Sequence, residues 1–316
     1  MRAVWLTEFG GPEVLVARDE PDPVPGPGQA LVDVAYANIT FIETLFRATG
    51  GGPVKATPPL IPGNGVGGMV AAVGAGVPAA LVGTRVVAGT GGSGGYASRV
   101  AVDANDVIAV PEGVALDAAT ALLADGRTAT LLVRTAEPKP GERVLVEAAA
   151  GGVGSLLVQL VKAAGAHVVA AAGGPRKLTV ARELGADEVV DYREPGWPAR
   201  AGSVDLVLDG VGGDVSRAAF ELLPRGGRLL SFGLSSGSWS PVTAEEAAAR
   251  GVTLLRTNAT PEVLRECTRS ALAEAAAGRL RPLIGQRFPL DRAADAHAAI
   301  ESRATVGKTL LEVRPR

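Results

Sequence analysis

Short apolar stretches separated by glycine- and proline-rich turns run through the first 118 residues of the chain. Alternation of apolar and polar residues over about four to eight positions is typical of strands that bury one face. Short strands at turn-bounded spacing favour a small barrel-like domain over a parallel sheet. The pattern predicts strands at Arg2–Leu6, Ala30–Ala37, Met69–Val73, Arg85–Ala88 and Tyr96–Val102, and a short helix at Thr40–Arg47.

The pattern changes near Asp117, where apolar residues begin to recur at helical spacing over Leu116–Arg134. Strands then alternate with helices, which is typical of a doubly wound parallel sheet with helices on both faces. After Asn258 come two amphipathic helices and a last strand. The predicted strands are Arg143–Glu147, His167–Ala172, Glu188–Asp191, Val204–Asp209, Arg228–Phe232, Val252–Arg256 and Lys308–Val313, and the helices are Gly152–Ala164, Pro175–Leu184, Glu262–Ala277 and Arg292–Ser302.

Composition narrows the possible partners of this 316-residue chain. Apolar residues make up 47% and charged residues 20%, enough for a sizeable core and too apolar for wholesale disorder. The formal net charge of −2 gives no electrostatic case for nucleic acid or for an anionic membrane surface. Every apolar run is interrupted before 18 residues, so no membrane span is predicted.

Cysteine and histidine are scarce, with Cys267, His167 and His297 as the full set. One cysteine excludes an internal disulfide, and three such residues cannot build the usual Cys- and His-based zinc sites, so no metal site is predicted. A Cys–His or Ser–His–Asp nucleophilic site would depend on one of two imidazoles. The chemistry is therefore expected to come from a cofactor, and with no signal-like segment at the start the predicted location is the cytoplasm.

A glycine-rich turn follows the first strand of the alternating region. Ala148–Gly154 places Ala149, Gly151 and Gly154 at the three small positions of the G-x-G-x-x-G pattern, between a strand and an apolar helix. Gly151 allows a pyrophosphate to approach the backbone, Gly154 allows the helix to pack on the strand, and the helix N-terminus offers N–H groups. This context predicts dinucleotide binding by the turn residues Ala150, Gly151, Gly152, Val153 and Gly154.

The end of the second strand indicates which dinucleotide is bound. An NAD site usually carries Asp or Glu here for the ribose 2′-hydroxyl. The chain instead has Gly173-Gly174-Pro175, followed by Arg176 and Lys177. Small residues leave room for a 2′-phosphate, and cations in a first helical turn oppose the helix dipole unless an anion joins them. The alternative is a solvated helix start, but the pattern favours NADPH.

With these motifs the chain resembles the zinc-free quinone oxidoreductase (zeta-crystallin-like) branch of the medium-chain dehydrogenase/reductase superfamily, over nearly its whole length. Each motif is modest alone, and their order and spacing are specific. The resemblance rests on Ile61-Pro62-Gly63, Gly67-Gly68-Met69-Val70, Val73-Gly74, Gly83-Thr84-Arg85-Val86, Gly95-Tyr96-Ala97, Ala148–Gly154, Leu184-Gly185-Ala186-Asp187, Asp191-Tyr192-Arg193-Glu194, Gly212-Gly213 and Gly307-Lys308.

The resemblance implies an α/β protein in which a GroES-like β-barrel catalytic domain is split by a Rossmann NADPH-binding domain. We expect the catalytic domain at residues 1–118 and 259–316, the nucleotide domain at 119–258, the active site in the cleft between them, and a homodimer formed through the edge strand Val252–Arg256. By the same resemblance Lys177 and Tyr192 lie at the 2′-phosphate, Thr128 approaches the nicotinamide, and Phe232 and Gly233 lie at its carboxamide end. Gly173 and Lys308 are further expected cofactor-binding residues.

Two departures from the family concern the substrate site. Zinc-dependent relatives carry a Cys near Thr40 and a Gly-His-Glu where this chain has Gly63-Asn64-Gly65, so zinc is not expected. Quinone oxidoreductases usually have Asn three residues before the acid of Asn-x-x-(Asp/Glu). Matched through Glu43, that place is Thr40, with Asn38 two residues earlier, and the Tyr often found two residues after the acid is Leu45.

Other chemistry-bearing residues have structural interpretations beside functional ones. We expect structural roles for His167 and His297, packing for Cys267, and a turn-anchoring role for Tyr96. Glu43 and Arg47, at i and i+4, either pair on one helix face or shape the cofactor cleft. Asp209 either positions the nicotinamide side or caps the following turn.

The sequence thus predicts an NADPH-dependent reductase of a small molecule with a conjugated carbonyl: a quinone, a 2-alkenal or an enone. Hydride comes from the cofactor, and Thr40 is the candidate hydroxyl donor for the developing oxygen charge. The Gly50–Gly52 loop and apolar residues of the first domain are expected to shape the pocket. The alternatives are a pathway-specific enoyl reductase for a larger intermediate and a non-catalytic, crystallin-like NADPH-binding protein.

Overall fold

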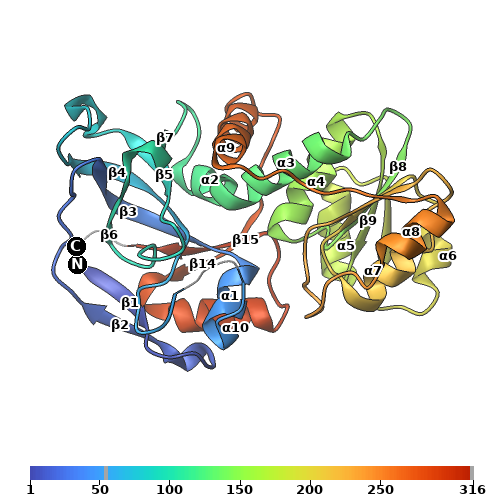
Figure 1. The fold of residues 1–316 in the computed structure, drawn as a ribbon, viewed down its shortest axis with the longest axis horizontal. Helices are drawn as coiled ribbons and strands as arrows, with labels where there is room; N and C mark the ends of the chain where they lie inside the picture. The colour runs from blue at the N-terminus through green and yellow to red at the C-terminus, as the bar shows by residue number, and fades with distance from the viewer. Residues whose placement is uncertain (53–55, 314–316) are drawn as a thin grey trace. The chain divides into compact units, whose positions relative to one another are not determined.

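A computed structural model describes residues 1–52 and 56–313 (Figure 1). The chain forms two compact units. Unit 1 comprises Met1–Asp125 and Thr268–Arg316, and unit 2 comprises Gly126–Cys267. Unit 2 is therefore inserted in sequence between the two parts of unit 1. The sequence pattern predicted the domain boundaries near residues 118 and 259, and the boundaries between the compact units fall after residues 125 and 267.

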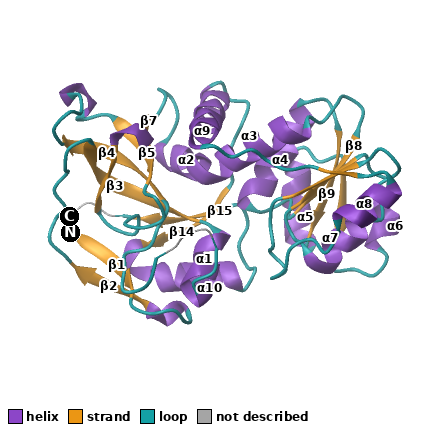
Figure 2. Cartoon of the chain, in the orientation of Figure 1, coloured by secondary structure: helices purple, strands orange, loops and turns teal. Residues whose placement is uncertain are grey.

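Unit 1 is built on a largely antiparallel seven-stranded sheet (Figure 2). The strand order is β14-β15-β3-β4-β5-β7, with β6 also paired to β3, and a separate hairpin-like pair is formed by β1 and β2. The long central strand β3 thus binds β4, β6 and β15. The bounds are β1 Arg2–Leu6, β2 Leu15–Asp19, β3 Gln29–Ile39, β4 Gly65–Val73, β5 Arg85–Gly89, β6 Arg99–Asp103, β7 Val107–Ala109, β14 Ile284–Pro289 and β15 Lys308–Glu312.

One face of these strands packs into the core of unit 1. Val32 and Val34 of β3, Val66 of β4 and Leu311 of β15 are buried there, because alternate residues of a strand point to the same side. Helices α1 (Phe41–Thr49) and α10 (Ala293–Glu301) contact each other, and α10 also packs against β14 and β15. The end of β3 and the start of α1 therefore rest on a rigid sheet.

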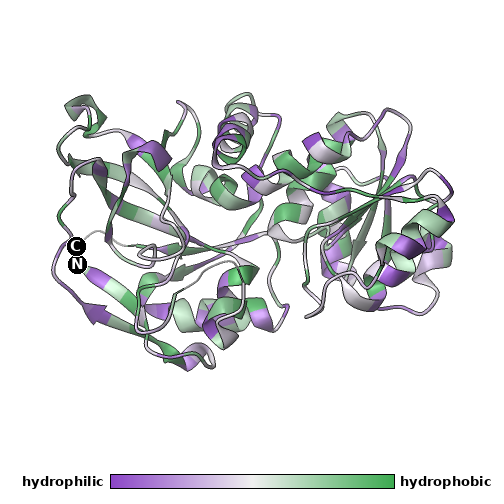
Figure 3. Ribbon diagram, viewed as in Figure 1, coloured by the Kyte–Doolittle hydropathy of each residue, from purple (hydrophilic) through white to green (hydrophobic). Residues whose placement is uncertain are grey.

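Unit 2 has a six-stranded, all-parallel sheet in the order β10-β9-β8-β11-β12-β13. The order reverses between β8 and β11, which is the switch point where open α/β sheets bind ligands at the carboxyl ends of their strands. The central residues of the strands are hydrophobic, as in buried parallel strands, and the polar residues stand at the strand ends (Figure 3). Their bounds are β8 Arg143–Glu147, β9 His167–Ala172, β10 Glu188–Asp191, β11 Leu206–Asp209, β12 Arg228–Ser231 and β13 Thr253–Leu254.

Helices connect the strands of unit 2, and α3 packs against α4. The sequence placed α4 and α5 within one residue of their observed ends, because a glycine-rich turn and a proline mark their starts. The region of helical spacing over Leu116–Arg134 contains α2 and α3, separated by a π-helical segment, Leu122–Gly126. The helices of unit 2 are α3 Arg127–Ala136, α4 Gly152–Ala163, α5 Pro175–Glu183, α6 Trp197–Ala201, α7 Gly213–Phe220 and α8 Ala244–Arg250. Helix α2, Leu116–Ala121, belongs to unit 1, and α9, Pro261–Ala276, begins in unit 2 and ends in unit 1.

Two predicted strands are shorter than their apolar runs. The strand predicted over Val252–Arg256 pairs at Thr253 and Leu254, and Tyr96–Val102 enters the sheet at Arg99. Tyr96 and Ala97 are buried although they precede the strand, whereas Leu255 is half-buried and Arg256 is exposed. Among the described residues, no helix is long and apolar enough to cross a membrane.

Candidate functional site

The glycine-rich turn between β8 and α4 is tightly wound. Ala148 has a left-handed φ of 48°, and its carbonyl oxygen accepts a hydrogen bond from Gly151 N at 2.8 Å. A β-carbon on Gly154 would lie 2.2 Å from that oxygen, so only glycine fits there. A β-carbon on Gly151 would lie 3.1 Å from it. The first amides of α4, at Gly152, Val153 and Gly154, therefore project from a helix N-terminus that has no side-chain cap.

A second group of polar residues lies where β9 and β10 end side by side, with Ala172 paired to Asp191. Asp191 is buried, and its Oδ2 accepts from Gly174 N at 2.9 Å. Arg193 places its guanidinium on the same carboxylate, at 3.1 Å from Nε and 2.9 Å from Nη2. This contact and the backbone N–H groups hold the pKa of Asp191 below its usual value.

Arg193 joins the residues predicted to bind the 2′-phosphate. A β-carbon on Gly174 would lie 2.4 Å from its Nη2, and one on Gly173 would lie 3.3 Å from the ring of Tyr192. Arg176 and Lys177 open α5 directly after this turn. The structure thus brings Gly173, Tyr192 and the start of α5 together and adds Arg193. The sequence feature that could have indicated Arg193 is its position two residues after the end of β10, because β10 pairs with β9 and their ends lie side by side.

The loops after β11 and β12 also meet. A β-carbon on Gly233 would lie 2.6 Å from the carbonyl oxygen of Gly210, and one on Gly210 would lie 2.9 Å from the Phe232 ring. Asp209 is buried and accepts from Val211 N at 3.0 Å and Gly212 N at 2.7 Å, so it caps this turn. Thr128 lies in the first turn of α3 and is partly exposed.

A pair of buried carboxyl groups lies at the switch point beneath these loops. Glu147 ends β8, and its Oε2 accepts from Val211 N at 3.2 Å. Burial, followed by the charge and hydrogen bond of Asp209, raises the pKa of Glu147 well above its usual value. The sequence pattern did not indicate that these two carboxyl groups lie together.

In unit 1, Thr40 caps α1 and is bound to Glu43 three residues later. The Oε2 atom of Glu43 accepts from Thr40 N at 2.6 Å and from Thr40 Oγ1 at 2.9 Å. Its Oε1 accepts from Asn64 N at 3.0 Å. This capping box secures the end of β3 to the turn before β4. Glu43 is buried, whereas Thr40 and Asn64 are partly exposed.

Burial governs the ionisation of Glu43. It raises the pKa of the carboxyl group to about 7, against the opposing effects of the Thr40 and Asn64 donors and of the Lys308 ammonium. Arg47, four residues along the same helix, binds elsewhere: its guanidinium contacts the Gly10 carbonyl and Glu301. The interpretation of Glu43 and Arg47 as a mutual pair is therefore not supported by the contacts.

Lys308, predicted to bind the cofactor, starts β15 and is buried with its ammonium 2.9 Å from Oδ1 of Asp125. Asn38 is fully buried near the end of β3, two residues before Thr40. A β-carbon on Gly65 would lie 2.5 Å from Asn38 Nδ2. The end of β3 thus brings Thr40, Glu43 and Lys308 into one polar cluster.

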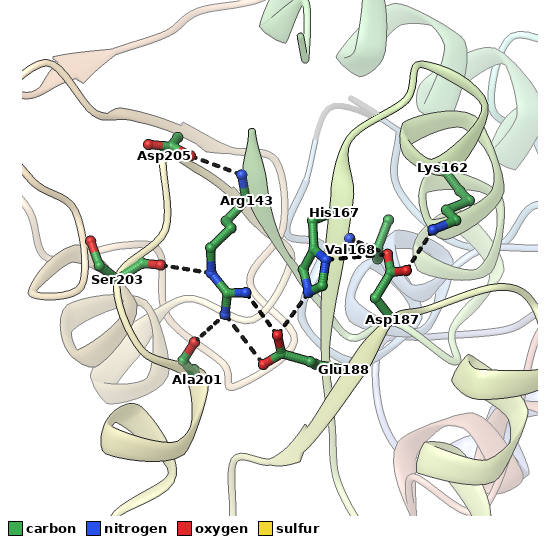
Figure 4. Close-up of polar contacts among 9 residues, drawn as sticks. All are labelled: Arg143, Lys162, His167, Val168, Asp187, Glu188, Ala201, Ser203 and Asp205. Atoms are coloured by element: carbon green, nitrogen blue, oxygen red, sulfur yellow. Dashed lines mark hydrogen bonds and ion pairs between the residues drawn. The ribbon is translucent and has the colours of Figure 1, made fainter. Parts of the chain in front are cut away.

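The histidines and the cysteine lie in structural settings. His297 is buried, and its Nε2 lies 2.9 Å from the Tyr96 hydroxyl. His167 belongs to a network of polar contacts among the first residues of β8, β9 and β10 (Figure 4). Its Nε2 lies 2.7 Å from Oε1 of Glu188, and Arg143 binds the same carboxylate. Cys267 is buried on α9, and burial raises the pKa of its thiol.

Within residues 1–52 and 56–313, no cluster of three or more His, Cys, Asp or Glu is placed to hold a metal ion. The polar groups around Thr40 are instead hydroxyl, amide, carboxyl and ammonium groups. Such groups form hydrogen bonds with oxygen atoms, and the turns of unit 2 are suited to phosphates.

Two family models match the chain: an alcohol dehydrogenase GroES-like domain over residues 26–112 and a zinc-binding dehydrogenase domain over residues 184–311. A probable quinone oxidoreductase of Schizosaccharomyces pombe is 35% identical, covering 98% of this chain and 96% of the relative. The chain belongs to the quinone oxidoreductase family. A quinone oxidoreductase of Pseudomonas aeruginosa is 32% identical, covering 98% and 99% of the two chains.

The fold agrees with this family assignment. The solved structure of an Escherichia coli quinone oxidoreductase complexed with NADPH matches with a TM-score of 0.90 at 31% identity, covering 99% of this chain and 100% of that one. The fold class inferred from the motifs, a GroES-like domain with a Rossmann-type parallel sheet, is confirmed.

Proposed function

We propose that this protein is an NADPH-dependent oxidoreductase that transfers hydride to a conjugated carbonyl acceptor such as a quinone, a 2-alkenal or an enone. One observation carries the proposal: an uncapped helix N-terminus on a turn where only glycine fits, beside a neighbouring strand end that presents cations. The quinone oxidoreductases that the chain resembles support it, including one solved with NADPH.

The residues of unit 2 fit this cofactor. The absence of a β-carbon at Gly151 and the projecting amides of Gly152, Val153 and Gly154, with the adjoining Ala150, suit a pyrophosphate. Arg176, Lys177 and Arg193, with the Tyr192 ring, suit a 2′-phosphate. Thr128, Phe232 and Gly233 are proposed for the nicotinamide end, and Lys308 as a further cation toward the cofactor.

The polar cluster of unit 1 is proposed to bind the substrate oxygen. NADPH, when bound, supplies the hydride. Negative charge then develops on the carbonyl oxygen, and a positioned hydroxyl stabilises it. Thr40 is the proposed catalytic residue, because its hydroxyl is partly exposed and is held in place by Glu43 and Asn64.

The remaining proposals concern the surroundings of the enzyme. We propose a homodimer formed through the edge strand β13, and a cytoplasmic location. A small molecule is the expected partner, since the balanced charge gives no basis for nucleic acid binding.

NADPH oxidation with 9,10-phenanthrenequinone and with a short 2-alkenal tests the proposal. Turnover of either acceptor with NADPH, and much weaker turnover with NADH, is the expected result. Tight NADPH binding without turnover of either acceptor would contradict the reductase function and favour a binding protein or an enzyme for a larger intermediate. Equal rates with NADH would contradict the assignment of the 2′-phosphate site.

A further inference from the structure

The hydroxyl of Thr40 has one hydrogen to donate and two lone pairs to accept with. Asn64 Nδ2 lies 3.4 Å from Thr40 Oγ1 and occupies one lone pair. Glu43 Oε2, at 2.9 Å, occupies a second position on the same oxygen. Among the contacts of the described residues, these two leave one position on the oxygen for a substrate. Whether that position offers a hydrogen or a lone pair depends on where the proton between Thr40 and Glu43 resides.

With Glu43 ionised, the carboxylate can only accept, so Thr40 donates its hydrogen to Glu43. The position left for a substrate is then a lone pair, which repels a carbonyl oxygen. With Glu43 protonated, the carboxyl O–H donates to Thr40 Oγ1 and fills its second lone pair. The Thr40 hydrogen is then free to point toward a substrate oxygen.

We propose that Glu43 is a positioning residue that acts through Thr40: its proton turns the Thr40 hydroxyl toward the substrate oxygen and replaces the proton that Thr40 gives up. This rests on the proposed function. As hydride adds to the substrate carbon, Thr40 O–H passes its proton to the oxygen, and Glu43 O–H passes its own to Thr40. The substrate gains a hydride and a proton, Thr40 is unchanged, and Glu43 is left as a carboxylate that solvent reprotonates before the next turnover.

The surroundings of Glu43 suit this role. The residue is 5% exposed, and burial disfavours its charged form, so that its pKa lies at about 7. The charged and titratable groups facing it are Lys308 on β15, whose ammonium also binds Asp125, and Tyr96 in the loop before β6. Ordinary capping boxes at a surface hold an ionised Glu, whereas this one holds a carboxyl group that is half protonated near neutral pH.

The test is the pH dependence of hydride transfer, followed as single-turnover decay of NADPH fluorescence with 9,10-phenanthrenequinone. In the unmodified enzyme the rate should fall about tenfold per pH unit once the pH rises above about 7. Glu43→Gln, which cannot give up a proton, should be about 10²-fold slower and should lose this pH dependence. Thr40→Ser should keep the profile and Thr40→Val should lose it.

Two controls separate this role from a structural one. Glu147→Gln removes a different buried carboxyl group of raised pKa, in unit 2, and should leave the midpoint of the profile in place. In the free protein labelled with ¹³C-glutamate, the carboxyl signal that Glu43→Gln removes should titrate near pH 7. It should titrate at a higher pH in Thr40→Val, because the carboxylate loses a donor.

The outcomes are distinguishable. A wild-type profile that persists in Glu43→Gln, or a Glu43 signal that titrates below pH 5, overturns the proposal while the reductase function stands. If the enzyme reduces neither acceptor, the proposed function fails, and the ¹³C titration in the wild type and Thr40→Val still decides whether the two groups share a proton.

Discussion

The hydroxyl of Tyr96 lies 2.9 Å from Nε2 of His297, deep in the core of unit 1. Both side chains are fully buried, and their rings meet edge to face at 5.7 Å. Burial, and then the charge of Arg47, lowers the pKa of His297 to about 3. The imidazole is therefore neutral in the folded protein at any pH where the protein works.

This buried imidazole predicts sensitivity to acid. An unfolded histidine has a pKa near 6.5, so the folding stability that comes from a neutral His297 is present above that pH and is lost as pH falls from about 6.5 toward about 3. His297→Gln can still bond to Tyr96 but does not titrate, and its unfolding free energy should fall less over this range. Urea titrations at pH 7 and pH 4.5 measure the difference, with His167→Gln as the control at a partly exposed site. Equal acid sensitivity of His297→Gln and the wild type would contradict the prediction.

The buried ion pair of Lys308 and Asp125 predicts an asymmetry between single and double variants. Lys308→Met leaves Asp125 buried without a counter-charge and should cost about 3 kcal/mol of unfolding free energy. Lys308→Met combined with Asp125→Leu should recover most of this loss. Arg279→Ala, which breaks an exposed pair with Glu274, should cost less than about 1 kcal/mol. A double variant no more stable than Lys308→Met would show that the two groups are not coupled.

Substitution of Gly154 or of Gly151 in the turn between β8 and α4 should have different effects. Gly154→Ala places a methyl group 2.2 Å from the Ala148 carbonyl and should destabilise unit 2 by about 1–3 kcal/mol. Gly151→Ala meets that oxygen at 3.1 Å with an ordinary φ of −81°, so the protein should fold with near-normal stability. Its methyl group should instead obstruct the pyrophosphate and weaken NADPH binding. Thermal unfolding and NADPH titration separate the two effects, and unchanged NADPH affinity in Gly151→Ala would contradict the placement of the pyrophosphate.

The parallel sheet was the part of the fold most readable from sequence, because its strands are buried on both faces. The runs at Arg143–Glu147, His167–Ala172 and Glu188–Asp191 match β8, β9 and β10. Unit 1 was less readable. Strands β2 and β14 were missed because β2 is largely exposed and β14 alternates weakly, and their places in the fold depend on partners far along the chain.

The candidate site likewise depends on contacts between residues far apart in the sequence, which the local sequence pattern does not predict. Thr40 and Glu43 lie three residues apart, and their spacing is visible in the sequence, but Asn64 completes the contact from 21 residues away. Burial of Glu43, which sets its ionisation, arises from the packing of α1 against other elements and has no local signature. Arg193 could have been placed near Gly174 only by pairing β9 with β10, a register that hydropathy does not specify.

Arg193 therefore offers the sharpest test of cofactor choice. Arg193→Ala removes a guanidinium from the Gly173–Gly174 turn and should raise the KM for NADPH about tenfold or more, since hydrogen bonds to charged groups contribute about 1.5–3 kcal/mol. The KM for NADH should change little, because that cofactor has no 2′-phosphate. Arg200→Ala, in the same stretch of chain but paired with Glu194 on the exposed side of α6, should leave both values near wild type. Because the Arg193 guanidinium also holds Asp191, a collapse of the turn would weaken both cofactors equally. A selective loss of NADPH is thus the result that assigns Arg193 to the phosphate, and an equal loss would assign it to the turn alone.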